Sequence, residues 1–128
     1  MKLHLDARTG ENRVRGYDRT SVRINETTYR RSLLLMPEEI VADWPPATLA
    51  DLRAEHLEQV AALAPEVVLL GTGARLCFPP RATLAPLHHA GIGVEVMSTD
   101  AACRTYNILS GEGRRVLAAL LIAEQAAG

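Results

Sequence analysis

The sequence is poor in aromatic residues and in lysine, and it contains no long apolar run. Aromatic side chains make up 4% of the 128 residues, and Lys2 is the only lysine, so arginine supplies nearly all the positive charge. No apolar stretch approaches the roughly 20 residues that a membrane-spanning helix needs. The formal net charge of −1 provides no overall basic field to attract nucleic acid. We therefore expect neither nucleic-acid binding nor membrane insertion.

Cysteine and targeting signals are also scarce. Cys77 and Cys103 are too few for a disulfide framework and are interpreted as reduced thiols. The first residues alternate like a strand and contain an acid, unlike the apolar core of a signal peptide or the acid-poor composition of a transit peptide. These features predict a soluble, cytoplasmic protein. Residues 1–128 have the length of a single domain.

The N-terminal third has the pattern of short strands. Residues 2–6 and 14–17 are expected strands, and residues 20–24 and 28–35 are expected to pair as a hairpin across Asn25 and Glu26. The second hairpin strand ends in three leucines, which indicates entry into a sheet covered on both faces. Seven arginines between positions 8 and 31 are either a basic patch or solvated strand faces, and their alternation with apolar residues favours the solvated faces.

The middle of the chain predicts a strand–helix–strand unit. Thr48 and Asp51 resemble a capping box ahead of a helix with Leu49, Leu52, His56, Val60 and Leu63 on one stripe. Trp44 and His56 are interpreted as packing residues, with an exposed recognition aromatic as the minority alternative for Trp44. Strands over residues 66–70 and 92–97 flank a helix over residues 81–90, which either starts near Thr83 or kinks at Pro86. The two strands are expected to be parallel.

The C-terminal part predicts two helices. The first runs from about Thr99 to Leu109, and the second runs from about Glu112 to Gln125, with Val116, Leu117, Leu120 and Leu121 as its apolar stripe. Taken together, the elements predict an α/β fold. It is a three-layer single domain with a mixed central sheet, helices on both faces and a β-hairpin extension from residues 20–35.

The stretch 95–114 carries a specific motif. Glu-Val-Met-Ser-Thr at 95–99 is followed by Ala-Cys-Arg-Thr-Tyr-Asn-Ile-Leu at 102–109 and Glu-Gly-Arg at 112–114, and a Gly-Thr-Gly turn stands at 71–73. Together these segments resemble a small domain-of-unknown-function family that includes a mitochondrial complex I (NADH dehydrogenase) assembly factor and an adipogenesis-associated protein. The resemblance implies one α/β domain and a role in protein assembly, but no reaction.

A candidate ligand site follows from the expected topology. The carboxyl ends of parallel strands share one edge of a sheet, where the Gly-Thr-Gly turn would meet the helix that begins near Thr99, its expected N-cap. The candidate ligand-binding residues are Gly71, Thr72, Gly73, Thr99, Arg104, Tyr106 and Asn107. The ligand would be a small anion or an acidic group of a partner protein. Alternatively, Tyr106 and Asn107 are buried and hydrogen-bond loop backbone, which would make the motif purely structural.

Enzyme motifs are incomplete. The turn lacks the third glycine of a dinucleotide fingerprint and the Gly-Lys-Ser/Thr of a P-loop. His88 and His89 lack the third ligand of a zinc site, so no metal or cofactor is expected. Cys103, near a helix N-terminus, would be a nucleophile if exposed, although the two histidines are expected at the opposite sheet edge. The sequence thus favours a non-enzymatic binding domain, with a Cys103 enzyme and a scaffold without ligand as alternatives.

Overall fold

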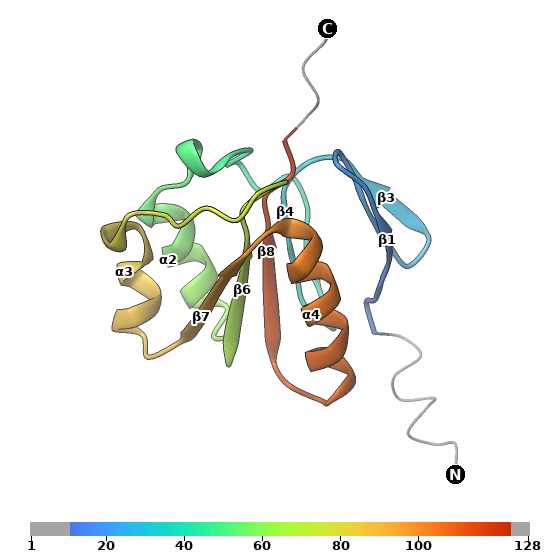
Figure 1. Cartoon of the computed structure of the whole chain (residues 1–128). Helices are drawn as coiled ribbons and strands as arrows, with labels where there is room; N and C mark the ends of the chain where they lie inside the picture. The colour runs from blue at the N-terminus through green and yellow to red at the C-terminus, as the bar shows by residue number, and fades with distance from the viewer. Residues whose placement is uncertain (1–10, 124–128) are drawn as a thin grey trace, which may run out of the picture.

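Two sheets form the framework of the chain, and the computed structural model describes residues 11–123 (Figure 1). The smaller sheet is antiparallel and contains β1 (Val14–Tyr17), β2 (Val22–Ile24) and β3 (Thr27–Tyr29). The hairpin between β2 and β3 turns at Asn25, whose φ of 54° suits asparagine, as the sequence predicts. The strand expected over residues 2–6 lies outside the described residues.

The larger sheet has five strands in the order β5-β4-β8-β6-β7. Its strands are β4 (Leu33–Leu35), β5 (Ile40–Val41), β6 (Val67–Gly71), β7 (Gly93–Met97) and β8 (Val116–Leu120). Strand β6 is parallel to both β7 and β8, whereas β4 pairs antiparallel with β5 and β8. The sheet is therefore mixed, and the predicted parallel pairing of β6 and β7 is confirmed.

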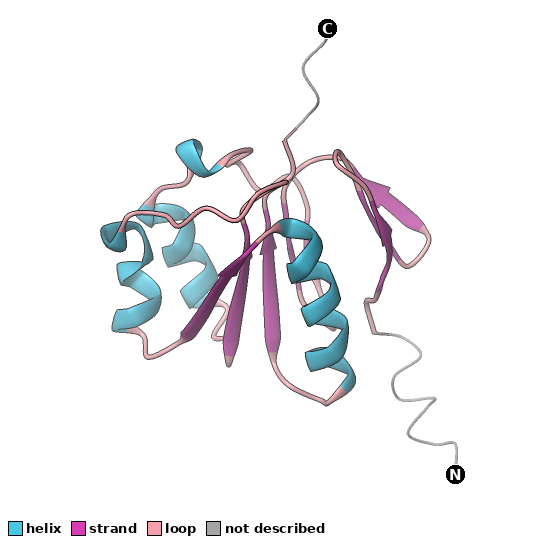
Figure 2. Cartoon of the chain, viewed as in Figure 1, coloured by secondary structure: helices cyan, strands magenta, loops and turns pink. Residues whose placement is uncertain are grey.

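The five-stranded sheet is covered on both faces, which confirms the predicted three-layer fold (Figure 2). Helices α2 (Ala54–Ala62) and α3 (Arg81–His89) pack on one face, with Leu57 and Leu87 against Leu70 and Leu117. Helix α4 (Thr99–Gly111) and the small sheet cover the other face. Trp44 is 2% exposed within the α2 layer, as its predicted packing role requires.

Residues 99–123 form one helix and one strand, so the predicted second helix over residues 112–125 is wrong. Residues 116–120 form β8, which lies at the centre of the large sheet between β4 and β6. Every residue of β8 is buried, and alternate side chains enter the two opposite cores. Leucine and alanine favour helices in isolation, but burial on both faces overrides that preference.

Three smaller expectations are corrected. The expected strand over residues 28–35 breaks at residues 30–32, so β3 and β4 lie in different sheets.

The helix starts also differ from the prediction. The Asp51 carboxylate does accept from Thr48, but this capping box begins a 3-10 helix, η1 (Leu49–Asp51), and α2 starts separately at Ala54. At the start of α2, the His56 Nδ1 accepts the backbone N–H of Arg53, which gives this histidine a structural contact. Helix α3 begins at Arg81 with Pro86 inside it, so it does not start late.

Candidate functional site

The Gly-Thr-Gly turn and the start of α4 meet at one edge of the large sheet, as predicted. The backbone N–H of Thr72 donates to the Met97 carbonyl at 2.8 Å, and the N–H of Thr99 donates to the Gly73 carbonyl at 2.9 Å. We call this region, residues 71–73 with 97–99, the rim. The carboxyl ends of β6 and β7 are in register there, because Gly71 pairs with Met97.

Thr99 joins three segments at the rim. Its buried Oγ1 accepts the N–H of Gly73 at 2.8 Å and donates to the carbonyl of Leu121 at 2.9 Å. The expectation that Thr99 is the N-cap is wrong: Ser98 is the N-cap residue, and its Oγ accepts from the N–H of Ala101. The Thr99 hydroxyl is thus directed into the protein, and its hydrogen-bonding capacity is used internally.

The two glycines of the turn have different steric roles. A Cβ on Gly71 would lie 2.9 Å from the Cα of Thr99 and 3.2 Å from the Cβ of Ala102, so α4 approaches β6 only because Gly71 has no side chain. Gly73 has φ of 103°, a conformation that L residues with side chains rarely adopt. Both positions therefore require glycine for reasons of packing and backbone geometry.

Thr72 fixes the loop that leaves the rim. Its Oγ1 donates to the carbonyl of Arg75 at 2.6 Å and accepts the N–H of Cys77 at 3.2 Å. The five residues 74–78 are all exposed, and this display loop, as we name it, carries Leu76 at 53% and Phe78 at 71% exposure. The sequence does not single out Leu76 and Phe78 as candidate contact residues, because exposure of a loop leucine or phenylalanine has no periodic signature.

The polar side chains Arg104, Tyr106 and Asn107 of α4 contact β1 and the residue Asn12 before it instead of the rim. The Tyr106 hydroxyl donates to the carbonyl of Asn12 at 2.8 Å. The Asn107 side chain holds both backbone groups of Val14: its Oδ1 accepts the Val14 N–H at 3.0 Å, and its Nδ2 donates to the Val14 carbonyl at 2.9 Å. Arg104 donates to the Tyr17 hydroxyl at 2.7 Å. These residues tie α4 to β1 and the residues just before it.

Burial and hydrogen bonding shift the pKa values on this face. Burial raises the pKa of the Tyr106 hydroxyl above its ordinary value. The hydrogen bond to Tyr17 raises the pKa of the Arg104 guanidinium. Tyr106 therefore remains a neutral hydrogen-bond donor at physiological pH, consistent with its contact to backbone.

Cys103 lies in the core that α4 forms with the small and the large sheet. Its side chain is fully buried, and burial, reinforced by the charge of Asp100, raises the pKa of its thiol to about 12. A buried, protonated thiol lacks the thiolate that a nucleophile requires. The other cysteine, Cys77, is exposed in the display loop. The geometry therefore offers no support for catalysis by Cys103.

Thiol modification should distinguish the two cysteines. We expect an aromatic disulfide reagent to modify one thiol rapidly in the native protein and two in denaturant, because only Cys77 is accessible. The Cys77→Ser variant is the control and should show no rapidly reacting thiol until it unfolds. A rapid native reaction in that variant would contradict the burial of Cys103 and restore the nucleophile hypothesis.

The remaining candidate groups are dispersed. His88 and His89 end α3, next to the start of β7 and therefore at the sheet edge opposite the rim. Within residues 11–123, no three side chains of histidine, cysteine, aspartate or glutamate are grouped to hold a metal ion. A hollow of about 420 Å³ also lies at that opposite edge, between Glu38, Glu39, Arg114 and Arg115. Its charged residues come from separate segments, so no sequence spacing indicates it.

The fold and the rim define a small α/β domain whose motif residues connect one helix to two sheets. The family model described as "Protein of unknown function (DUF498/DUF598)" matches residues 14–121. The chain belongs to this family, which confirms the resemblance noted from residues 71–73 and 95–114.

Solved structures and curated relatives agree with this membership. A crystal structure of a Bordetella parapertussis protein is 44% identical, covers 89% of this chain and 98% of its own, and superposes with a TM-score of 0.83. NADH dehydrogenase (ubiquinone) 1 alpha subcomplex assembly factor 3 of Danio rerio is 36% identical over 110 residues, 84% of this chain. A "13 kDa major membrane protein" of Francisella tularensis is 37% identical over 68 residues, 53% of this chain.

The matched regions are only parts of those two relatives. They span 63% of the Danio rerio protein and 55% of the Francisella protein. In residues 11–123 of this chain, no helix is both long enough and apolar enough to cross a membrane. One relative is named as an NADH dehydrogenase (ubiquinone) assembly factor and another as a membrane protein, so a cytoplasmic location stays a prediction.

Proposed function

We propose that this domain is a non-enzymatic protein-binding module that acts in the assembly of another protein, with the display loop as its contact site. The observation that carries the proposal is the exposure of Leu76 and Phe78 on a loop held by Thr72. Several relatives bear the name of an NADH dehydrogenase (ubiquinone) assembly factor, which supports a protein partner for this chain. The proposal does not assign the partner of those relatives to this chain.

The loop has the properties of a preorganised anchor. Phe78 is 71% exposed, and burying an aromatic side chain of that kind in a partner's pocket is a common source of binding energy. The Thr72 hydroxyl hydrogen-bonds the backbone of both Arg75 and Cys77. These bonds restrict the free loop, so the loop loses less conformational entropy when it binds a partner. Arg75 and Arg81 are exposed on either side of Phe78. The complementary surface is therefore an apolar pocket with acidic residues around it.

In this proposal, the polar site between the Gly-Thr-Gly turn and α4 positions the loop. Gly71, Gly73 and Thr99 set the close approach of α4, and Thr72 shapes residues 75–77. A small anion bound by Arg104 and Asn107 is the less favoured form of the site. It would require these side chains to release Tyr17 and Val14, to which they are hydrogen-bonded.

A double substitution in the display loop tests the proposal. We expect Leu76→Ser with Phe78→Ser to reduce recovery of the bound partner at least tenfold in quantitative affinity purification from the native organism. Both side chains are more than half exposed, so the melting temperature should change little. The measurement is mass spectrometry of proteins recovered with tagged wild type and variant.

Ile108→Ser is the matched control, because Ile108 is an apolar side chain with 61% exposure on α4. The control should retain the partner. If no recovered protein distinguishes the loop variant from wild type and control, the binding assignment is wrong and the scaffold without ligand becomes the better account.

A further inference from the structure

Strand β7 is an open edge of the large sheet. It pairs with β6 on one side only, and none of its five residues is buried, whereas all five residues of β8 are. The opposite edge, β5, is only two residues long. Among the described strands, β7 is thus the longest edge that another chain could extend.

The unpaired backbone groups of β7 belong to Val94 and Val96. The Met97 carbonyl accepts from the N–H of Thr72, so the backbone N–H and C=O of Met97 point toward β6. By alternation along the strand, the backbone groups of Glu95 and Gly93 also point toward β6. The N–H and C=O groups of Val94 and Val96 therefore point to the open side. Within residues 11–123 no other backbone or side-chain group bonds to them.

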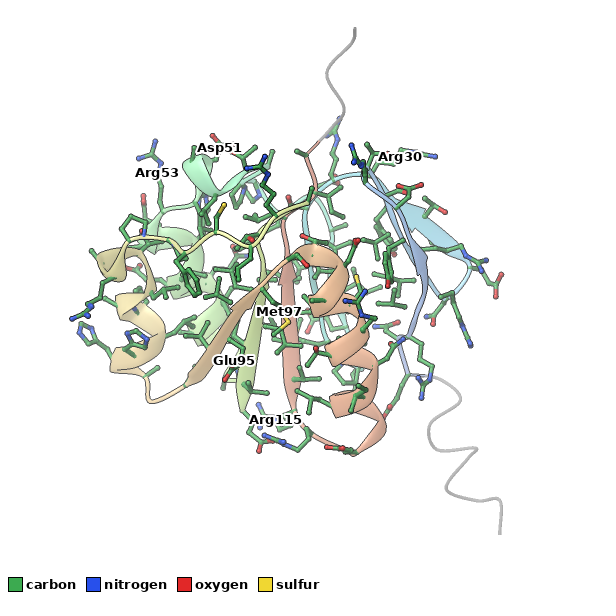
Figure 3. All side chains as sticks on the ribbon, in the orientation of Figure 1. Arg30, Asp51, Arg53, Glu95, Met97 and Arg115 are labelled. Carbon is green, nitrogen blue, oxygen red and sulfur yellow. The ribbon has the colours of Figure 1, made fainter. Side chains whose placement is uncertain are left out.

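The side chains of β7 differ between the two faces of the sheet. Val94 and Val96 pack at the border of the core under α2 and α3. Glu95 and Met97 lie on the other face (Figure 3), where Met97 borders the α4 core and Glu95 is exposed. Glu95 forms no ion pair or hydrogen bond with any described residue. The open edge therefore carries the unpaired carboxylate of Glu95 on one face and two half-buried valines, which flank Glu95 in sequence, on the other.

We propose that β7 binds an extended segment of a partner protein as an additional strand, with a lysine or arginine opposite Glu95. Residues of the segment opposite Val94 and Val96 are aliphatic or β-branched and extend the core under α3. The four outward backbone groups of the two valines supply the hydrogen bonds, and the pair with Glu95 sets register and specificity.

The charge of Glu95 argues against a second copy of this chain as the occupant. An antiparallel pairing that satisfies Val94 and Val96 of both copies places Glu95 opposite Glu95. Like charges directly opposite each other across two strands are destabilising. The same carboxylate that opposes self-association therefore favours a basic partner segment.

The inference rests on the edge geometry and is separable from the proposed role of the display loop. Loop variants test one contact surface and β7 measurements test the other. Loss of partner binding in the loop variant, together with no strand addition at β7, would retain the proposed function and overturn only this inference.

Titration with a blocked peptide of sequence Ser-Thr-Val-Lys-Val-Thr-Ser tests strand addition. We expect saturable shifts in the amide NMR signals of Val94 and Val96. Replacing the peptide's lysine by glutamate should weaken binding at least about threefold, from loss of the opposite-charge pair. N-methylation of both peptide valines should abolish binding, because it removes backbone donors without altering the protein.

A charge exchange supplies the matched control. Glu95→Lys should reverse the preference, so that the glutamate peptide binds more tightly than the lysine peptide. Glu112→Lys changes net charge equally at an exposed position away from β7 and should leave the preference unchanged. The inference is overturned by shifts confined to other residues, by no saturation up to the peptide's solubility limit, or by indifference to charge or N-methylation. Concentration-dependent shifts of Val94 and Val96 without peptide would identify a second copy as the occupant and would also overturn it.

Discussion

Asn107→Ala is expected to lower the free energy of unfolding by about 2 kcal/mol, because two hydrogen bonds to backbone are lost together. The Asn107 side chain accepts from the N–H of Val14 and donates to its carbonyl, and Val14 itself is buried. Alanine cannot replace either contact, so both backbone groups lose their partners. The melting temperature should fall by roughly 6 °C or more.

Hydrogen exchange provides the second measurement for this variant. The amide of Val14 should exchange faster, while amides of β6 and β8 keep their protection until global unfolding. Thr105→Ala, a change in the same helix at a side chain that makes no hydrogen bond within residues 11–123, serves as control and should cost much less. An Asn107→Ala protein with unchanged stability but lost partner binding would instead make Asn107 a contact residue.

Gly71→Ala is expected to destabilise the protein by about 2 to 3 kcal/mol, because the added methyl group meets backbone that has no room to move. The new Cβ would lie 2.9 Å from the Cα of Thr99 and 3.1 Å from its Oγ1. Relief requires α4 to shift away from β6, which stretches the Thr99 bonds to Gly73 and Leu121. Denaturant unfolding monitored by circular dichroism measures the loss.

Gly93→Ala is the matched control, since Gly93 begins the neighbouring parallel strand and a Cβ there meets nothing within 4 Å. Its free energy of unfolding should remain within about 0.5 kcal/mol of wild type. Equal effects at positions 71 and 93 would show that the glycine in β6 is not required by its contact with Thr99.

These two variants also relate the motif to function. Gly71 and Thr99 set the position of α4 over the sheet, and Asn107 holds β1 to the outer side of the same helix. Motif residues thus connect the rim, the helix and the small sheet. The exposed Leu76 and Phe78 lie outside the family motif, which comprises residues 71–73 and segments of residues 95–114. The structure separates residues that shape the domain from residues available to a partner.

Local pattern was sufficient for several elements and for the place where two of them meet. Largely apolar segments at residues 66–70 and 92–97, with a helix between them, predicted parallel β6 and β7 and the meeting of residues 71–73 with the start of α4. The same approach misassigned residues 116–120. The helix prediction relied on the spacing of Val116, Leu117, Leu120 and Leu121. Ala118 and Ala119 are apolar as well, and an unbroken apolar segment is what a strand buried on both faces requires.

The candidate site was predicted in part. Spacing along a helix placed Cys103, Tyr106 and Asn107 on one side of α4, but spacing does not state which element that side contacts. The small sheet occupies it, so Tyr106 and Asn107 bond to residues 12 and 14, far away in sequence. Ligand binding by the seven candidate residues stays a prediction.

The sequence by itself determined the α/β class, the parallel unit and the glycine requirement at the turn, because these follow from periodicity and backbone sterics among near neighbours. Only the tertiary structure decided that residues 116–120 enter the sheet, that Cys103 is buried, and that β7 and the display loop remain open. The physical reason is that burial and strand order depend on which distant segments pack together. That packing is a property of the whole chain, and no local window contains it.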